Sequence, residues 1–313
     1  MHEQITNISA GASERNEQIE SKEEILLQVI IQRHGPKLSA SGEKNQLAAY
    51  FAESVKQGFK SAEVSHGEGL VHVSSSPVQR AVDTAKIDIA ELAHTSHRVK
   101  DAVVNKESLA VPFQPVADAA DPKFARDLDV IVRMQKTMEP GIRESVVVSH
   151  PDLRGEEMES EVRNAIDMEV LTDLFLDENS DKKSFETSYR ELADKFASRY
   201  KGFLRHIGML KKYKESDEAK QPEGEPYVQV DISHSFPVTC FLKEYLVFDD
   251  GVRAKDLSPE DFFERTGGII RESGSLKMEF IQVTQNGKND EEVEIHIRGS
   301  FTKGRLFSGK IIF

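Results

Sequence analysis

Residue types that suit phosphate chemistry follow three short apolar runs of this sequence. The runs and the polar residues after them are residues 25–31 with Arg33, His34 and Gly35, residues 70–74 with Arg80, and residues 227–233 with His234 and Ser235. Arginine guanidinium groups match phosphate oxygens in a bidentate geometry. A neutral imidazole can attack phosphorus, and a second imidazole can stabilise the group in transfer. Together these residue types indicate chemistry on a phosphoryl group.

Short β-branched runs such as residues 25–31 predict buried strands, and a stretch with helical spacing of apolar residues follows each of the first two runs. A strand–helix–strand–helix order favours a parallel sheet with helices on its faces. Ligands of such sheets bind beyond the carboxyl ends of the strands, where helix N-termini add N–H donors for an anion. We therefore expect two arginines and two histidines to meet in one crevice. Gly35 would let the backbone approach the phosphoryl group.

The rest of the chain adds three regions to this predicted core. Residues 1–24 have too few apolar residues to offset the entropy of ordering and predict a disordered tail. Residues 119–215 are highly charged and mostly helical in pattern, which indicates a helical cap inserted into the domain at about residues 108–226. The late runs that predict further strands of the sheet are residues 276–284, 293–298 and 306–313. The expected fold of residues 25–313 is α/β, with three α/β/α layers and a mainly parallel sheet.

The polar residues lie within three longer blocks. Residues 33–35 read Arg-His-Gly, residues 75–81 read Ser-Ser-Pro-Val-Gln-Arg-Ala, and residues 232–234 read Ile-Ser-His. In these blocks and in their order, residues 25–95 and 227–248 resemble the histidine phosphatase superfamily, in its phosphoglycerate mutase-like branch. The resemblance implies a histidine phosphatase domain with a phosphoglycerate mutase-like fold. The helical middle corresponds only to a variable cap.

The resemblance also implies roles for the polar residues. His34 would be the nucleophile and would form a phosphohistidine. The residues expected to hold and stabilise the phosphoryl group are Arg33, Gly35, Arg80, His234 and Ser235. No metal or other cofactor is expected, because the arginines and histidines supply the positive charge that Mg²⁺ supplies elsewhere.

The proton donor of this family is a carboxylate near the end of another strand. Residues 101–107 fit that description best, so Glu107 is the candidate acid, and Asp118 and Asp101 are the alternatives. Such a carboxyl group would protonate the leaving oxygen and would later help water to attack the phosphohistidine. The residues around Glu107 differ from the sequence motif that is usual in the family.

Two further departures bear on the prediction. Ser235 stands where the family usually has a glycine after its second histidine. Only two residues separate the Arg-His-Gly block from the next Leu-Ser pair, whereas the true mutases carry a longer segment there that grips phosphoglycerate.

A competing second histidine is His150, because residues 146–150 also predict a strand that ends in Ser-His. Proline follows His150, so His234 is favoured.

Composition excludes several classes of function. The 313 residues carry 41 Lys and Arg against 54 Asp and Glu, and a net charge of −13 argues against nucleic-acid binding. No apolar run approaches the ~20 residues of a membrane span, and residues 1–24 lack the apolar segment of a secretory signal. Cys240 is the single cysteine, so no disulfide can form within the chain. These features predict a cytoplasmic protein, and no feature of the sequence sets an oligomeric state.

The predicted function is metal-independent hydrolysis of a phosphate monoester through a phosphohistidine on His34, with a small phosphorylated molecule as the substrate. Two alternatives stay open. One is phosphoglycerate mutase-type transfer of phosphate within a small metabolite. The other is a non-catalytic protein that binds a phosphorylated ligand. The identity of the substrate depends on residues of the expected cap, which the sequence does not place.

Overall fold

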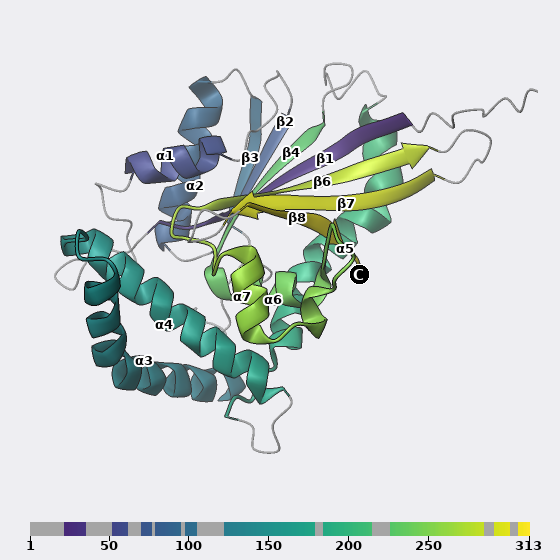
Figure 1. The fold of residues 1–313 in the computed structure, drawn as a ribbon. Helices are drawn as coiled ribbons and strands as arrows, with labels where there is room; N and C mark the ends of the chain where they lie inside the picture. Colours follow the sequence, from purple (N-terminus) through teal and green to yellow (C-terminus); the bar gives the residue numbers. More distant parts are fainter. Residues whose placement is uncertain are drawn as a thin grey trace, which may run out of the picture.

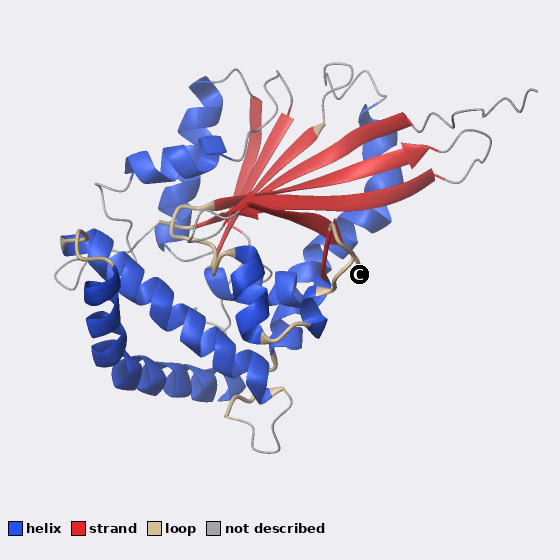
Figure 2. Cartoon of the chain, in the orientation of Figure 1, coloured by secondary structure: helices blue, strands red, loops and turns tan. Residues whose placement is uncertain are grey.

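The computed structural model describes residues 22–35, 52–61, 70–76, 79–94, 98–104, 122–178, 184–214, 226–284, 291–300 and 306–313 (Figure 2). Its strands are β1 (Lys22–Arg33), β2 (Leu70–Ser75), β3 (Arg98–Val104), β4 (Tyr227–Ser233), β5 (Leu246–Phe248), β6 (Ser275–Thr284), β7 (Glu291–Ser300) and β8 (Leu306–Ile311). Its helices are α1 (Ala52–Ser61), α2 (Gln79–His94), α3 (Pro122–Ser149), α4 (Gly155–Asp177), α5 (Tyr189–Lys214), α6 (Ser235–Tyr245), the short 3-10 helix η2 (Ala254–Asp256) and α7 (Pro259–Thr266).

The described strands form one eight-stranded sheet in the order β3-β2-β4-β1-β6-β7-β8-β5. The strands from β3 to β1 pair in parallel, whereas β1–β6 and every pair beyond it are antiparallel. The predicted α/β class and the C-terminal extension of the sheet are confirmed. The expected mainly parallel sheet is wrong, because the sheet is mixed. The connections explain the difference, since β6, β7 and β8 follow one another without the crossover helix that usually joins parallel strands.

Helices cover both faces of the parallel half of the sheet (Figure 1). Along β1, Ile30 packs in a cluster with Phe59 of α1 and Leu92 of α2. Val29 and Ile31 belong to the cluster on the opposite face, to which α5 and α6 contribute. This alternation has the period of two that is expected for a strand buried on both faces. The parallel half of the sheet is therefore the middle one of three α/β/α layers.

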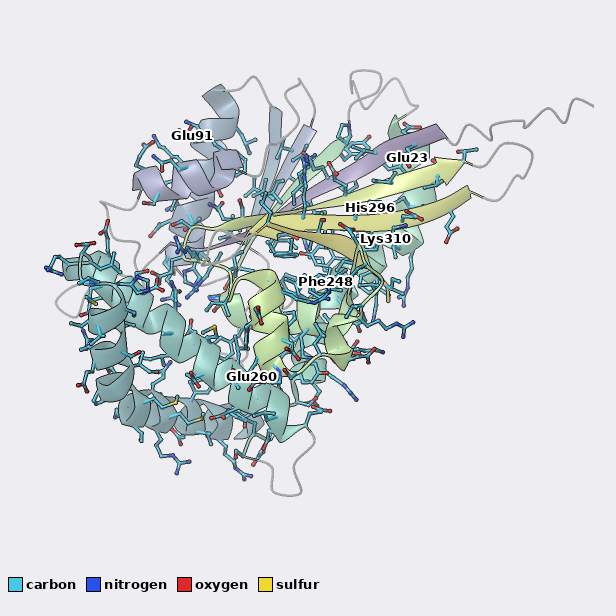
Figure 3. The ribbon with its side chains drawn as sticks, in the orientation of Figure 1. Glu23, Glu91, Phe248, Glu260, His296 and Lys310 are labelled. Carbon is cyan, nitrogen blue, oxygen red and sulfur yellow. The ribbon has the colours of Figure 1, made fainter. Side chains whose placement is uncertain are left out.

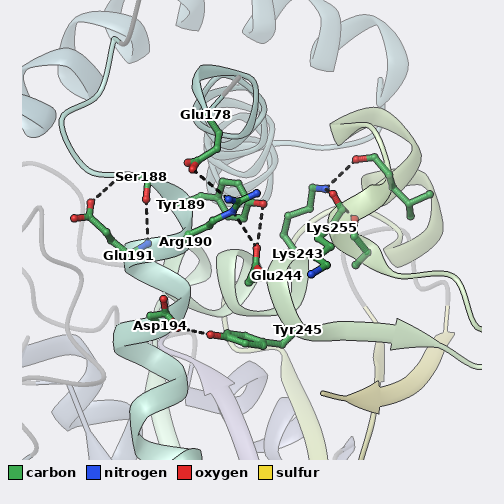
Figure 4. Close-up of polar contacts among 12 residues, drawn as sticks. Glu178, Ser188, Tyr189, Arg190, Glu191, Asp194, Lys243, Glu244, Tyr245 and Lys255 are labelled. Atoms are coloured by element: carbon green, nitrogen blue, oxygen red, sulfur yellow. Dashed lines mark hydrogen bonds and ion pairs between the residues drawn. The ribbon is translucent and has the colours of Figure 1, made fainter. Parts of the chain in front are cut away.

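The helical middle of the chain divides into a projecting hairpin and a helix that packs on the sheet. Helices α3 and α4 contact each other and extend away from the strands (Figure 1). Helix α5 packs against α6, where Arg190 lies 3.5 Å from Glu244 and the Tyr245 hydroxyl donates to Asp194 (Figure 4). A cap within residues 108–226 stays a prediction, and the α3–α4 hairpin lies within that range.

Two expectations about single elements need correction. The competing strand at residues 146–150 is wrong, because residues up to Ser149 belong to α3 and His150 is exposed. Val146 alone of its valine run is buried in the core, as helical spacing allows. The predicted tail also ends earlier than expected, because β1 begins at Lys22 and pairs with Thr284 of β6. The rest of that tail lies outside the described residues.

The antiparallel half of the sheet carries charge on one face. In β8, Phe307 and Ile311 join the large core cluster, whereas Lys310 points to the other face. There Glu294 lies 2.7 Å from both Lys310 and His296, and Figure 3 labels the last two residues. Paired charges make this face compatible with water, as is common in antiparallel sheets. No helix within the described ranges is long and apolar enough to cross a bilayer.

Candidate functional site

The predicted nucleophile, His34, follows the last residue of β1. Its backbone N–H donates to the Ser233 carbonyl of β4 at 3.1 Å, which ties the ends of these two strands together. The His34 side chain is 3% exposed, and its Nδ1 lies 2.7 Å from the Gly35 carbonyl oxygen. Because a carbonyl oxygen only accepts, we assign the proton to Nδ1. Nε2 then carries the lone pair that a nucleophile requires.

The second predicted histidine, His234, lies directly beside the first. It is the N-cap residue of α6, and its ring centroid lies 4.6 Å from that of His34, with the rings inclined at 69°. Its Nε2 lies 2.8 Å from the Ser76 hydroxyl, which follows the end of β2. The carboxyl ends of β1, β2 and β4 therefore converge at the two imidazole rings.

Arg33 precedes the nucleophile and is held by three acceptors. Its Nη1 donates to Asn164 Oδ1 at 2.9 Å and to the Ile270 carbonyl at 2.8 Å, and its Nη2 donates to Asp167 Oδ2 at 3.0 Å. Two of these acceptors come from α4, the helix of the projecting hairpin nearest the site. With three fixed contacts, the buried guanidinium has a set orientation beside His34.

Arg80 lies in the first turn of α2, which begins at Gln79. The Thr84 hydroxyl donates to the Arg80 carbonyl at 2.8 Å and accepts the Gly35 N–H at 3.1 Å, so the start of α2 is fixed beside the nucleophile. Burial, followed by the charge of Arg33, lowers the pKa of Arg80 to about 10. At neutral pH the guanidinium is still charged.

Both histidines are neutral in this environment. Burial is the largest cause that lowers the pKa of His34 and of His234 well below its usual value, and the positive charge of Arg80 is the second. Arg33 shifts both pKa values in the same direction. Only the neutral imidazole has the lone pair needed to attack phosphorus, so these pKa shifts favour the reactive form.

The site also contains hydrogen-bond donors that suit an anion. The Nε–H groups of Arg33 and Arg80 are buried and have no hydrogen-bond partner among the described residues. Buried donors in proteins normally have hydrogen-bond acceptors, so we expect a bound ligand to supply acceptors for these two N–H groups. The N-terminus of α6 begins at His234 and adds backbone N–H groups and a partial positive charge. This arrangement can hold an oxyanion next to a nucleophilic nitrogen.

The structure places the remaining predicted site residues unequally. Ser235 is buried, and its hydroxyl donates to Asp167 Oδ2 at 3.3 Å. Glu107 and Asp118 lie outside the described residues. The backbone of Asp101 lies within β3, three residues before the strand ends, so it is roughly 10 Å from the carboxyl edge. No three His, Cys, Asp or Glu side chains in the described ranges form a cluster that could hold a metal ion.

Sequence reasoning missed the groups that surround the arginines. These are Asn164 and Asp167 of α4, the Ile270 carbonyl and Glu272. The two α4 residues are three positions apart and so share one helix face, which is the only signal that linked them. They contact Arg33, which lies more than a hundred residues earlier in the chain. Such a contact follows from the fold rather than from any local sequence pattern.

A close backbone approach supports the site from the α1 side. The Ser273 N–H donates to the His34 carbonyl at 3.3 Å, and Gln32 Nε2 donates to both the Val55 and Ser273 carbonyls. Ser273 adopts a positive φ of 65°. Gly58 of α1 packs so closely that a Cβ there would lie 1.7 Å from the Ser273 carbonyl oxygen. The His34 backbone is therefore bonded to Ser233 of β4 and to Ser273, which Gly58 of α1 approaches closely.

No protein-family model and no curated protein matches this sequence. Similar solved structures include a phytase from Klebsiella sp. (11% identity, 93% of this chain and 90% of that chain covered, TM-score 0.37). They also include a mycobacterial glucosyl-3-phosphoglycerate phosphatase (12%, 85% and 98%, 0.38) and a phosphoglycerate mutase from Plasmodium falciparum (13%, 91% and 99%, 0.30). At TM-scores this low, the likeness carries no argument about the function of this chain.

Proposed function

We propose that this protein hydrolyses phosphate monoesters through a phosphohistidine formed on His34. The observation that carries the proposal is the unprotonated Nε2 of His34, which lies beside the neutral imidazole of His234, the buried guanidinium of Arg33 and the largely buried, charged guanidinium of Arg80. This set supplies a nucleophile and the positive charge that stabilises a phosphoryl group in transfer. The resemblance in sequence supports the same chemistry.

In the proposed reaction, His34 Nε2 attacks phosphorus as the ester bond breaks. The alcohol leaves with a proton from a carboxylic acid, for which the sequence offers Glu107, Asp118 and Asp101. Water then attacks the phosphohistidine, the P–N bond breaks, and its electron pair returns to Nε2. The Nδ1–H of His34 stays bonded to the Gly35 carbonyl, which stabilises the positive charge of the phosphorylated ring.

The proposed substrate is a small phosphorylated molecule, and the proposed reaction needs no metal ion. Charge from the arginines can take the place of a divalent cation at the transferring group. A panel of sugar phosphates, nucleotides and phosphopeptides, assayed with and without EDTA, tests both statements. Loss of turnover in EDTA would reject the metal-independent mechanism.

The nucleophile is tested by replacing His34 with alanine and measuring the turnover of p-nitrophenyl phosphate. We expect turnover to be abolished, and we expect radiolabelled phosphate to be trapped on wild-type His34 in an alkaline quench, because the P–N bond of a phosphohistidine is stable in base and labile in acid. His150→Ala is the matched control, because His150 is exposed at the end of α3 and its loss should leave turnover unchanged. Unchanged turnover in the His34 variant would reject this assignment.

A further inference from the structure

Asp167 is the carboxylate that lies between the two histidine-bearing strand ends. Its Oδ2 accepts from Arg33, which precedes His34, at 3.0 Å and from Ser235, which follows His234, at 3.3 Å. Both hydrogen bonds reach the same oxygen. Within the described part of the chain, Oδ1 accepts none, so one oxygen of this carboxyl group is available to another molecule.

The position of Asp167 suits a group that meets a substrate. Its side chain is 17% exposed, against 6% for Arg33, so the carboxyl group is largely enclosed but keeps an accessible edge. It comes from α4, a helix that lies away from the sheet in Figure 1. A phosphate ester bound at the arginines would have its leaving group on the side away from His34, because attack and departure are roughly in line.

We propose that Asp167 is the proton donor of this site and protonates the leaving oxygen of the substrate. The inference rests on the proposed function and deepens it, because it assigns the acid to a residue of α4 instead of Glu107, Asp118 or Asp101. The side chain of Asp167 is bonded to the residues that flank both histidines.

The step balances without any further reactant. As His34 Nε2 bonds to phosphorus, the bond between phosphorus and the ester oxygen breaks. The electron pair of that bond stays on oxygen, which takes the Asp167 proton and leaves as an alcohol. In the second step the Asp167 carboxylate takes a proton from water as the water oxygen bonds to phosphorus. The P–N electron pair returns to Nε2, and inorganic phosphate departs while Asp167 is protonated again.

The surroundings of Asp167 shift its pKa upward, which is the direction that this role requires. Burial is the largest cause that raises the pKa of Asp167, and Glu272 raises it further, whereas Arg33, Arg80 and the Ser235 hydroxyl oppose the shift. A bound phosphate ester brings two negative charges to the same arginines. Nearby negative charge disfavours the ionised carboxylate, so substrate binding raises the pKa of Asp167 further and favours its protonated form.

The test compares two substrates that differ in their need for an acid. Asp167→Asn keeps an acceptor for Arg33 but has no proton to give. We expect kcat/KM for an alkyl phosphate to fall by ~10²–10⁴-fold. For 2,4-dinitrophenyl phosphate, whose leaving group needs no proton, we expect a much smaller loss. The ratio of the two values is independent of the fraction of the sample that folds, and Asp167→Glu should restore part of the lost activity.

Matched variants separate proton donation from positioning. Asn164→Ala removes the other side-chain acceptor of Arg33 and should lower kcat/KM for both substrates by the same factor. Glu169→Gln removes an exposed carboxylate of α4 and should change neither. Equal losses on both substrates in the Asp167 variant, with the leaving-group effect found in Glu107→Gln instead, would overturn the proposal. A wild-type protein that turns over neither ester would reject the proposed function itself.

Discussion

Arg80 combines buried charge, an unpartnered donor and closeness to Arg33, so its removal should affect stability and activity in opposite directions. Burial lowers the pKa of its guanidinium from the ordinary arginine value to about 10, and one pKa unit corresponds to 1.36 kcal/mol. The charged form is therefore disfavoured in the folded state by about 3 kcal/mol. Because the folded pKa of this base is the lower one, the penalty is complete below about pH 10 and disappears only above the ordinary pKa of arginine. At pH 7 the penalty is present in full.

Arg80→Met keeps most of the side-chain length and removes the charge. Without phosphate, we expect the variant to unfold at a higher temperature than the wild type, by roughly 2–4 °C for each kcal/mol gained, up to the limit of about 3 kcal/mol. We expect kcat for p-nitrophenyl phosphate to fall by ~10²–10³-fold, as for the loss of one donor to a transition-state oxyanion. Thermal melts at pH 7 and steady-state kinetics measure the two effects.

Phosphate provides an internal check on the same reasoning. A ligand that binds only the folded protein stabilises it according to its concentration relative to Kd, so phosphate should raise the Tm of the wild type more than that of Arg80→Met. Arg205→Met is the control, since Arg205 is exposed on α5 and should alter neither Tm nor kcat. An Arg80 variant that is less stable than the wild type, or that keeps its kcat, would refute the electrostatic argument.

Two further predictions concern stability. Gly58→Ala should destabilise the fold, because its Cβ would meet the Ser273 carbonyl oxygen, whereas Gly202→Ala, with open space around it, should stabilise α5 by about 0.5–1 kcal/mol. Urea unfolding measures both changes, and equal changes in the free energy of unfolding would contradict the close approach. Asp88 is buried with no partner for either oxygen in the described chain, and burial followed by Glu91 raises its pKa, so the wild type loses stability as pH rises above about 4. Asp88→Asn should therefore be the more stable protein at pH 7 but not below pH 4, and a gain of the same size at both pH values would argue against a buried charge.

The residues that meet at the carboxyl ends of the parallel strands were predictable from the sequence. Each of them follows an apolar run, and parallel strands all end at the same edge of the sheet. Apolar β-branched runs predicted β1, β2 and β4, and parallel pairing carries their carboxyl ends to one edge. His34, Arg33 and His234 meet there for that reason.

The other half of the sheet and the surroundings of the arginines were not predictable in the same way. Alternation in β6–β8 reveals strands but not their direction, which depends on how the chain returns after each one. Asp167 and Asn164 look like ordinary polar residues of an amphipathic helix. Their contact with Arg33 depends on how α4 leans over the strand ends, and no local propensity specifies that angle.

A chain with a net charge of −13 can bind a dianion only if its positive charge is concentrated and its carboxylates are distant or neutral. Water and salt screen the surface carboxylates over ~8 Å, whereas buried groups are screened far less. The groups that act on Arg80 are the arginines Arg33 and Arg163 and the carboxylates Glu272 and Asp167. With Arg80 itself they carry one excess positive charge, which a dianion converts to one excess negative charge. Protonation of Asp167 restores balance, so charge alone couples substrate binding to the loading of the acid.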